Sequence, residues 1–305
     1  MSKALTRILF FINPKSGSVR LDELVEDIEN LFSSKKYEYE IVLANRKASI
    51  ETQVREACNN KDYDILAAAG GDGTVSTLAH VVANFSKKPR FGIIPVGTAN
   101  ILAREVGVPL DTHQALTILK QSNAYKEIDA LEANGILYFL RISVGISSLT
   151  IQNLTGEEKR LYKSFAYIRR GIINHFGCNR RTFTLHINQS SIATFKASDI
   201  VVTNFGRLLF PFITLGPTVR PDDGLADVLV FKKYSITQML KLIYKMMFHK
   251  VHTRKDKDLA YFSHVNTITI ESRKRLPVQA DGDIIGYTPV TIKLVPRILK
   301  IITLE

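Results

Sequence analysis

A glycine-rich turn between an apolar run and a helical pattern constrains the fold of this chain most strongly. The run Tyr63–Ala69 has the composition of a buried strand, residues 70–74 read Gly-Gly-Asp-Gly-Thr, and apolar residues recur at helical spacing over Val75–Phe85. Glycines free the backbone to adopt positive φ and let a ligand approach without meeting a Cβ, and a helix start offers N–H groups to an anion. The turn therefore predicts phosphate binding. The charge of Asp72 does not favour phosphate, so we expect it to act on a metal ion or on hydroxyl groups beside the phosphates.

Strand and helix patterns alternate through the first half of the chain. Strands are expected at Ile8–Ile12, Tyr39–Ala44, Tyr63–Ala69 and Phe91–Ile94, and helices at Leu21–Phe32, Ile50–Cys58, Val75–Phe85 and Ile101–Val106. Repeated strand–helix units with short turns imply a parallel sheet covered on both faces, and ligands of such sheets bind at the carboxyl ends of the strands. The polar turns after the first, third and fourth strands should therefore line one edge.

Strand patterns dominate after residues 130–135. Lys126–Ala133 and Ile136–Val144 flank Asn134-Gly135, a strong hairpin signal. Further segments are strands at Arg181–Asn188, Thr194–Asn204, Asp227–Phe231, Val265–Glu271 and Val290–Val295, and helices at Glu157–His175 and Ile236–Lys250. We expect an α/β domain over residues 1–132 and a β-rich antiparallel sandwich over residues 133–305, with the C-terminal tail returning to the first domain.

The charge balance favours an anionic partner. Lys and Arg number 41 against 29 Asp and Glu, a net charge of +12, which suits nucleic acid, an acidic membrane surface or a polyphosphate. We find no nucleic-acid recognition motif, so nucleic acid is not an expected partner. Two distant cysteines, Cys58 and Cys178, argue against a disulfide framework and fit a reducing cytoplasm. No apolar run reaches the ~18 residues of a membrane-spanning helix.

Two other turns of the first half carry groups that can hold phosphate oxygens. Residues 13–17, Asn-Pro-Lys-Ser-Gly, offer an amide, an ammonium and a hydroxyl, although a solvated turn is the alternative. Residues 95–100, Pro-Val-Gly-Thr-Ala-Asn, offer a hydroxyl and an amide at another helix start. There the alternative is a helix N-cap, which Thr98 or Asn100 would serve.

Two turns of the second half carry clustered carboxylates. Residues 220–227, Arg-Pro-Asp-Asp-Gly-Leu-Ala-Asp, present three, and oxygen ligands suit Mg²⁺ or Ca²⁺, although Asp-Gly turns without metal are as common. Asp281-Gly282-Asp283 presents two after the run Leu276–Ala280. It is a candidate for proton abstraction, with a plain hairpin turn as the alternative.

These five motifs together resemble the diacylglycerol kinase catalytic family, most closely its soluble bacterial lipid kinases. Asn-Pro-x-Ser-Gly, Gly-Gly-Asp-Gly-Thr, Pro-x-Gly-Thr-x-Asn, Asp-Asp-Gly-Leu-x-Asp-Val and a late Asp-Gly-Asp/Glu occur in the family's order and spacing. The likeness covers nearly the whole chain. NAD kinases and ATP-dependent phosphofructokinases share the glycine motif, but neither is expected to carry the other four motifs in this arrangement.

The resemblance implies a fold, an activity and cofactors. It implies an N-terminal α/β domain with a parallel sheet like that of NAD kinases and phosphofructokinases, and a C-terminal β-sandwich for the lipid. The expected enzyme uses ATP and Mg²⁺ to phosphorylate a hydroxyl of a membrane lipid, with diacylglycerol or a related glycerolipid as the leading substrate. Two alternatives stay open: an NAD kinase, and a non-catalytic module that binds nucleotide and lipid.

The resemblance also assigns residues. Nucleotide binding falls to Asn13, Lys15, Ser16, Gly17, Gly70, Gly71, Asp72, Gly73, Thr74, Val75, Ser76, Gly97, Thr98 and Asn100. Mg²⁺ falls to the carboxylate of Asp223 and the backbone carbonyls of Arg220 and Leu225. The proton acceptor is Asp283, with Asp281 as its alternative.

Three positions depart from the family pattern. Asp283 stands where the family usually has Glu, Ser76 replaces the usual Asn, and Ala44 takes the place of a nucleotide-contacting Thr. A misplacement of ~1 Å in a catalytic group can lower the rate ~10²-fold. The side chain of Asp283 is one methylene shorter than that of Glu, so this replacement affects what we expect of both the substrate and the reaction rate.

One helical segment suggests how the protein meets a membrane. Within Ile236–Lys250 the residues Met239, Leu240, Ile243, Met246 and Met247 form an apolar face, and Lys241, Lys245 and Lys250 add positive charge. Basic residues near anionic headgroups contribute ~1 kcal/mol each, which favours a cytoplasmic protein bound peripherally to the inner face of the membrane. The alternative is a helix that packs on the second domain. A homodimer is also left open.

Overall fold

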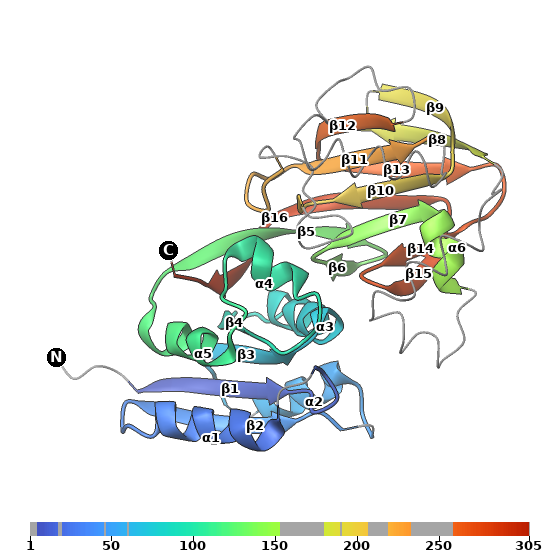
Figure 1. The fold of residues 1–305 in the computed structure, drawn as a ribbon. Helices are drawn as coiled ribbons and strands as arrows, with labels where there is room; N and C mark the ends of the chain where they lie inside the picture. Colours follow the sequence, from blue (N-terminus) through green and yellow to red (C-terminus); the bar gives the residue numbers. More distant parts are fainter. Residues whose placement is uncertain are drawn as a thin grey trace. The chain divides into compact units, whose positions relative to one another are not determined.

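The structure is a computed structural model that describes residues 5–17, 20–45, 47–59, 61–152, 180–189, 191–206, 219–232 and 259–304. The chain divides into two compact units, which Figure 1 shows in ribbon form. Unit 1 comprises Met1–Ile128 and Arg297–Glu305, and unit 2 comprises Asp129–Pro296. The expected helices Glu157–His175 and Ile236–Lys250 lie outside the described residues.

Unit 1 is built on a parallel sheet. Its strands are β1 (Thr6–Ile12), β2 (Tyr37–Leu43), β3 (Ile65–Gly70) and β4 (Arg90–Pro95), in the order β2-β1-β3-β4. The end of the long strand β16 (Val290–Ile302) joins this sheet, where Ile301 pairs in parallel with Phe91. Every residue of β3 is buried, as expected for a central strand with helices on both sides. The predicted parallel sheet is confirmed.

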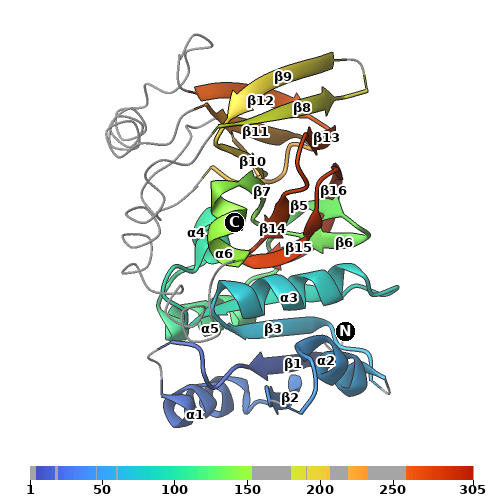
Figure 2. The same cartoon turned by 90° about the vertical axis from the view of Figure 1, so that its right-hand side faces the viewer.

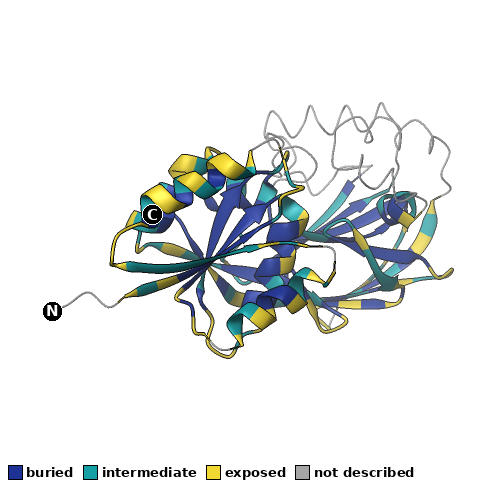
Figure 3. Cartoon of the chain, turned by 90° about the horizontal axis from the view of Figure 1, so that it is seen from below, coloured by how far each residue is buried: buried dark blue, intermediate teal, exposed yellow. Residues whose placement is uncertain are grey.

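Helices cover this sheet. They are α1 (Leu21–Phe32), α2 (Ile50–Cys58), α3 (Asp72–Ala83), α4 (Ile101–Val106) and α5 (Thr112–Gln121). Helix α1 buries Leu24, Ile28 and Phe32, a stripe at intervals of four residues. It packs beside α5, while α2 packs beside α3. Figure 3 shows the buried strands of unit 1 in dark blue between helices with exposed outer surfaces in yellow. None of the described helices has the length and apolar character needed to cross a membrane.

Helix α3 begins earlier than the sequence pattern predicted. The pattern placed its start at Val75, whereas the structure starts the helix at Asp72. Gly71 occupies the N-cap position with φ −84° and ψ 178°, so Asp72 and Gly73 already belong to the first helical turn. The motif glycines Gly70, Gly71 and Gly73 do not have positive φ angles. Close approach, rather than a left-handed backbone, is therefore the property that these glycines offer.

Unit 2 consists of antiparallel strands. They are the end of β5 (Tyr125–Ala133), which begins in unit 1, and β6 (Ile136–Tyr138), β7 (Arg141–Gly145), β8 (Arg181–Ile187), β9 (Ser191–Ala197), β10 (Asp199–Thr203), β11 (Ala226–Phe231), β12 (Leu259–Val265), β13 (Thr267–Ser272), β14 (Pro277–Ala280) and β15 (Asp283–Tyr287). One sheet has the order β12-β11-β10-β7-β14-β15. The start of β16 continues a second run, β16-β13-β8-β9. A short helix, α6 (Ile146–Gln152), packs on β7, β14 and β15 (Figures 1 and 2).

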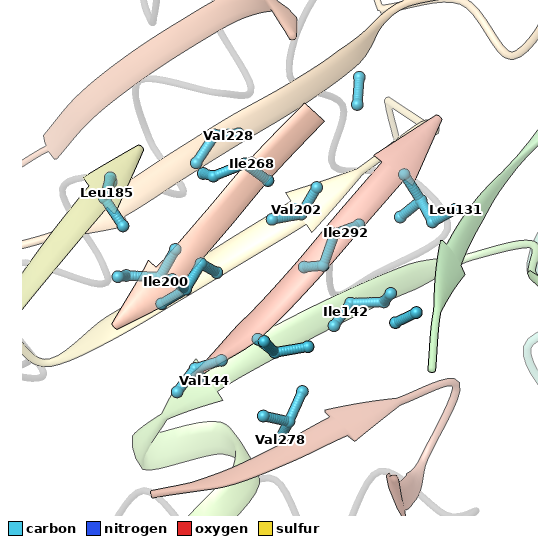
Figure 4. Packing of buried hydrophobic residues seen from close by; sticks show 14 of the residues in the cluster. Leu131, Ile142, Val144, Leu185, Ile200, Val202, Val228, Ile268, Val278 and Ile292 are labelled. Atoms are coloured by element: carbon cyan, nitrogen blue, oxygen red, sulfur yellow. The ribbon is translucent and has the colours of Figure 1, made fainter. Parts of the chain in front are cut away.

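A continuous apolar core joins the two sheets of unit 2. Figure 4 shows Ile142, Val144, Ile200, Val202, Val228 and Val278 of one sheet packed with Leu185, Ile268 and Ile292 of the other. All of these side chains are buried. The predicted antiparallel sandwich is confirmed.

Two predicted strands of unit 2 are each divided in the structure. The run Ile136–Val144 is interrupted at Phe139 and Leu140 because their backbone N–H groups donate to the Asp281 carboxylate instead of to a neighbouring strand. The run Thr194–Asn204 changes sheets at Ser198, whose N–H donates to the Phe231 carbonyl at 2.8 Å. The result is two strands, β9 and β10, in different sheets.

Candidate functional site

Three loops of unit 1 leave the carboxyl ends of β1, β3 and β4. The strand order reverses direction between β1 and β3, and ligands of open α/β sheets bind at such a switch point. Asn13 begins the first loop, and its backbone N–H donates to the Ala69 carbonyl at 2.9 Å. The first loop therefore starts beside the end of β3.

Direct contacts join the first loop to the other two. The side-chain amide of Asn13 donates to Thr74 Oγ1 at 2.8 Å, and its Oδ1 accepts from the Lys15 N–H at 3.1 Å. Gly17 has φ +81°, and a Cβ there would lie 1.4 Å from the Val96 carbonyl oxygen. Only glycine fits at Gly17. The contact of Asn13 with Thr74 and the close approach of Gly17 to Val96 confirm that the three turns meet at one edge of the sheet.

Asp72 links the glycine loop to the loop after β4. Its Oδ2 accepts from the Asn100 N–H at 3.0 Å and its Oδ1 from the Ile101 N–H at 2.6 Å, so this carboxylate caps α4. Burial raises the pKa of Asp72, and the backbone N–H groups that it accepts from oppose that shift. The sequence interpretation placed Asp72 on a metal ion or on hydroxyl groups. The structure shows that each of its oxygens accepts a hydrogen bond from a backbone N–H group, and the role toward a metal ion or hydroxyl groups stays a prediction.

Asn100 closes the third loop on itself. Its backbone is left-handed, with φ +49°, and its side chain accepts from the Gly97 N–H at 3.0 Å and donates to the Gly97 carbonyl at 2.8 Å. Asn100 stands at the N-cap position of α4, but its side chain makes no capping bond. Thr98, at the tip of the loop, is exposed.

The space around the motif glycines differs from one to the next. A Cβ at Gly97 would lie 2.5 Å from Gly71 Cα, so packing between the two loops requires glycine there. A Cβ at Gly71 would meet nothing closer than Gly97 Cα at 3.6 Å, and one at Gly73 would meet nothing within 4 Å. The fold of unit 1 therefore does not require glycine at 71 or 73. Glycine at these two positions is explained instead by ligand binding, because the absence of a Cβ lets a ligand approach the first turn of α3.

The remaining predicted nucleotide residues divide by exposure. The side chains of Thr74, Val75 and Ser76 are buried, and the Val75 N–H donates to the Gly71 carbonyl at 3.0 Å within α3. Lys15 is exposed. Ala44 follows β2, and its N–H donates to the Ile12 carbonyl at 2.8 Å, which places it beside the end of β1.

In unit 2, Asp129 clamps the acidic loop at residues 220–225. This residue is fully buried; its Oδ2 accepts from the Gly224 N–H at 2.7 Å and its own N–H donates to the Pro221 carbonyl at 2.7 Å. The side-chain amide of Asn204 donates to the same carbonyl at 3.2 Å. Sequence reasoning missed Asp129 and Asn204 because both are distant from the loop along the chain.

The three carboxylates of residues 220–227 have different partners. Asp222 pairs with the Arg220 guanidinium at 3.0 Å, and Asp227 accepts a hydrogen bond from the Tyr261 hydroxyl. Burial raises the pKa of Asp227 to about 6. Asp223 is exposed, and its Oδ1 accepts from the Leu225 N–H at 3.0 Å. Of the three, Asp223 is the one turned toward solvent.

The donors assigned to Mg²⁺ suit a hard cation. They comprise the Asp223 carboxylate and the carbonyls of Arg220 and Leu225, all of them oxygens, on a loop that Asp129 holds. Within the described ranges, no three His, Cys, Asp or Glu side chains gather closely enough to hold a metal ion. Backbone carbonyls and water would therefore complete the coordination.

Asp281 and Gly282 form a two-residue hairpin turn between β14 and β15. Their φ angles are +47° and +100°, and Ala280 pairs directly with Asp283 across the turn. The Asp281 carboxylate accepts from the N–H groups of Phe139, Leu140 and Arg141 at 3.0 to 3.2 Å. Asp281 thus ties the hairpin to the segment that leads into β7.

Asp283 is the exposed carboxylate of this hairpin. It starts β15, and among the described residues no hydrogen bond engages its side chain. Burial, together with the charges of Asp281 and Asp283, raises the pKa of the nearby Tyr138 to about 12. Tyr138 is a neighbour of the turn that the sequence pattern did not reveal.

The architecture that emerges is shared by diacylglycerol kinases and NAD kinases. A solved structure described as a diacylglycerol kinase from Bacillus anthracis superimposes with a TM-score of 0.74 at 20% identity, covering 97% of this chain and 96% of that chain. Yeast NADH kinase complexed with NADH gives a TM-score of 0.61 at 12% identity, covering 100% of this chain and 85% of that one. These likenesses establish the fold.

Sequence comparison establishes the family. Residues 7–133 match the diacylglycerol kinase catalytic domain, and residues 141–303 match the YegS C-terminal NAD kinase beta sandwich-like domain. A diacylglycerol kinase of Staphylococcus carnosus (strain TM300) is 24% identical over 290 residues, which cover 93% of this chain and 90% of that protein. The chain belongs to the diacylglycerol kinase-like family that combines these two domains.

We predict that Gly71→Ala weakens ATP binding at least 10-fold and leaves unit 1 folded. Alanine adopts the backbone angles of Gly71 without strain, and its Cβ would meet no protein atom closer than Gly97 Cα at 3.6 Å, so the loss would come from a clash between the Cβ and the bound phosphates. Isothermal titration calorimetry measures the affinity and circular dichroism the melting temperature.

Gly97→Ala is the control for this experiment. Its Cβ would lie 2.5 Å from Gly71 Cα, so it should lower the melting temperature as well as the affinity. A folded Gly71→Ala variant with unchanged affinity for ATP would exclude the glycine loop as the phosphate site.

Proposed function

We propose that this protein is an ATP-dependent lipid kinase that phosphorylates a hydroxyl of diacylglycerol or a related glycerolipid. The observation that carries the proposal is the room left at Gly71 and Gly73, at the switch point of a parallel sheet, where the fold does not require glycine. Membership of the diacylglycerol kinase-like family supports the lipid as acceptor. Phosphoryl transfer consists mainly of positioning and charge stabilisation, which backbone N–H groups at a helix start can supply.

The proposed reaction moves one phosphoryl group and one proton. The hydroxyl oxygen of the lipid bonds to the γ-phosphorus, and the bond from that phosphorus to the β–γ bridging oxygen breaks, which releases ADP. The hydroxyl proton passes to a carboxylate, for which we propose Asp283. The loops after β1, β3 and β4 would hold the phosphates through backbone N–H groups and through the exposed Lys15 and Thr98.

The contacts of the hairpin favour Asp283 over Asp281 as the proton acceptor. Asp281 already accepts from three backbone N–H groups, so its carboxylate oxygens are engaged within the fold. Asp283 is exposed and is held by a hairpin with a defined turn. An exposed carboxylate can reach a hydroxyl presented from outside the fold.

For the metal we propose Mg²⁺ held by Asp223 and the carbonyls of Arg220 and Leu225. When bound, a divalent cation offsets negative charge on phosphate groups and fixes the loop that carries it. The protein itself contributes the clamp on this loop, through Asp129 and the Gly224 N–H.

Two further proposals concern location. We propose that the protein is cytoplasmic and that its net charge of +12 draws it to anionic lipid at the inner face of the membrane. The segment Ile236–Lys250, which suggested this association from its sequence, lies outside the described residues.

The proposed activity predicts transfer of labelled phosphate from ATP to a glycerolipid in mixed micelles that contain Mg²⁺. Diacylglycerol, phosphatidylglycerol and other hydroxyl lipids form the panel, and NAD serves as the soluble acceptor. If the protein acts at an anionic surface, the rate should rise with the anionic fraction of the micelle and fall with salt.

Each other outcome has a distinct meaning. Phosphorylation of NAD alone, without need for a lipid surface, would replace the lipid kinase by an NAD kinase, in line with the shared fold. Binding of ATP and lipid without turnover would indicate a non-catalytic module.

Asp283→Asn and Asp281→Asn should separate the two carboxylates of the hairpin. Asp283→Asn removes the proposed acceptor and should lower kcat at least 100-fold, with ATP affinity and melting temperature unchanged. Asp281→Asn places an amide before three N–H donors, and the unsatisfied donors should destabilise unit 2 by about 1–3 kcal/mol. Steady-state kinetics and thermal unfolding measure these effects. Loss of turnover in Asp281→Asn alone, at unchanged stability, would move the acceptor to Asp281.

Asp223→Ala tests the cation loop. If Asp223 holds Mg²⁺, saturating Mg²⁺ should raise the melting temperature of the parent more than that of the variant, because a ligand of the native state stabilises it. Asp222→Ala is the matched control, since Asp222 pairs with Arg220 on the same loop. Equal stabilisation of the parent and Asp223→Ala would contradict the site.

A further inference from the structure

We propose that Gln279 and Ser143 are positioning residues that hold the hairpin turn at Asp281-Gly282, and with it the carboxylate of Asp283. The proposal rests on the proposed function, in which Asp283 accepts the proton. It derives from a chain of buried and part-buried hydrogen bonds that leads from this turn to Asp199.

The chain starts in the turn itself. The Gly282 N–H donates to Gln279 Oε1 at 3.2 Å, and Gln279 Nε2 donates to Ser143 Oγ at 2.6 Å. The hydroxyls of Ser143 and Ser147 lie 2.7 Å apart, and the Ser147 hydroxyl donates to Asp199 Oδ1 at 2.9 Å. Four side chains from β14, β7, α6 and β10 therefore form one continuous path.

The donors and acceptors along this path have a fixed order. Gln279 donates its amide hydrogen to Ser143, and Asp199 accepts the hydrogen of Ser147 at the far end. The Ser143 hydroxyl is then left to donate to Ser147. The amide group of Gln279 is thereby oriented with its oxygen toward Gly282, where the turn needs an acceptor.

Packing alone does not explain these residues. Gln279 is 3% exposed and Ser143 is 1% exposed, and burying polar groups costs free energy unless they are hydrogen-bonded. Gln279 and Ser143 pair directly across β14 and β7, so both point to the same face of the sheet. Their neighbour Val278 belongs to the sandwich core on the other face. Helix α6 packs on β7 and β14 and supplies Ser147, the next residue of the path.

The path holds the hairpin from one direction, while Asp281 holds it from another. Asp281 bonds the N–H groups of the segment before β7, and Gln279 bonds the N–H of Gly282. Asp281 has a φ of +47°, which is uncommon for a residue with a side chain, so these bonds maintain a conformation that the backbone alone does not favour. Asp283 follows directly, and a register irregularity between Val278 and Gln279 adjoins the same turn.

Gln279→Met and Ser143→Ala test this inference in the full-length protein. Methionine matches the volume of glutamine and removes both hydrogen bonds, while Ser143→Ala removes the support for the Gln279 amide. Both variants should lower kcat for lipid phosphorylation about 10-fold or more, with KM for ATP unchanged, because a carboxylate displaced by ~1 Å transfers protons poorly.

Ser148→Ala is the matched control. Ser148, in α6, is a buried serine like Ser143. Its hydroxyl accepts from the N–H of Gly145 and donates to the carbonyl of Gly145, at 3.0 Å each, outside the path to the turn. It should lower the melting temperature and leave kcat unchanged. Equal losses of kcat in Ser143→Ala and Ser148→Ala would show a general loss of stability and overturn the positioning role.

Hydrogen–deuterium exchange separates this inference from the proposed function. Exchange over residues 280–284 should accelerate in Gln279→Met and Ser143→Ala but not in Ser148→Ala, whether or not the parent phosphorylates a lipid. If the parent phosphorylates no lipid but this exchange pattern is observed, the kinase proposal is refuted. The inference that Gln279 holds the turn would still stand. Unchanged exchange in Gln279→Met would refute the positioning role itself.

Discussion

The contact between the Asp72 carboxylate and the start of α4 is the interaction on which the loops of unit 1 depend. A negative charge beside a phosphate site would oppose nucleotide binding. Both Asp72 oxygens, however, accept from backbone N–H groups at the N-terminus of α4, where unpaired N–H groups carry partial positive charge. The same bonds fix the third loop against the glycine loop. Gly97 then lies so close to Gly71 that a side chain at position 97 would clash with the glycine loop.

Aspartates in this protein have two distinct uses. Asp72, Asp129 and Asp281 each accept from backbone N–H groups and hold a loop in place. Asp223 and Asp283 are exposed and adjoin loops held in this way. Chemistry is proposed at the exposed carboxylates, and the partly or fully buried ones supply rigidity to the loops that carry them. This division follows from hydrogen bonding, because carboxylate oxygens that already accept backbone N–H groups are engaged within the fold.

The sequence predicted most of unit 1 because its signals are local. Helical periodicity placed α1, α2 and α4 at the bounds that the structure has. Helix α5 was missed, although Asp111, which caps it by accepting from the Gln114 N–H, offered a signal. The three loops were predicted to meet because parallel strands end at one edge of a sheet, but the bonds from Asp72 to α4 connect residues 28 and 29 positions apart and leave no local pattern.

Unit 2 was less predictable because its organising contacts are distant along the chain. The strand pattern gave the sandwich, yet it could not show that Asp281 interrupts the run Ile136–Val144 from a position about 140 residues away. The same holds for Gln279, which reads as a polar residue in a short strand until its contact with Ser143 is known. The assignments of ATP to unit 1 and of Mg²⁺ to Asp223 stay predictions.

The phosphates of ATP are proposed to bind the backbone N–H groups at the first turn of α3. A titration with a non-hydrolysable ATP analogue and Mg²⁺, followed by amide chemical shifts in NMR spectra, tests this proposal most directly. The largest shift changes should occur at residues 71–74 and 97–98. Saturable binding that leaves these amides unperturbed and moves others instead would contradict it.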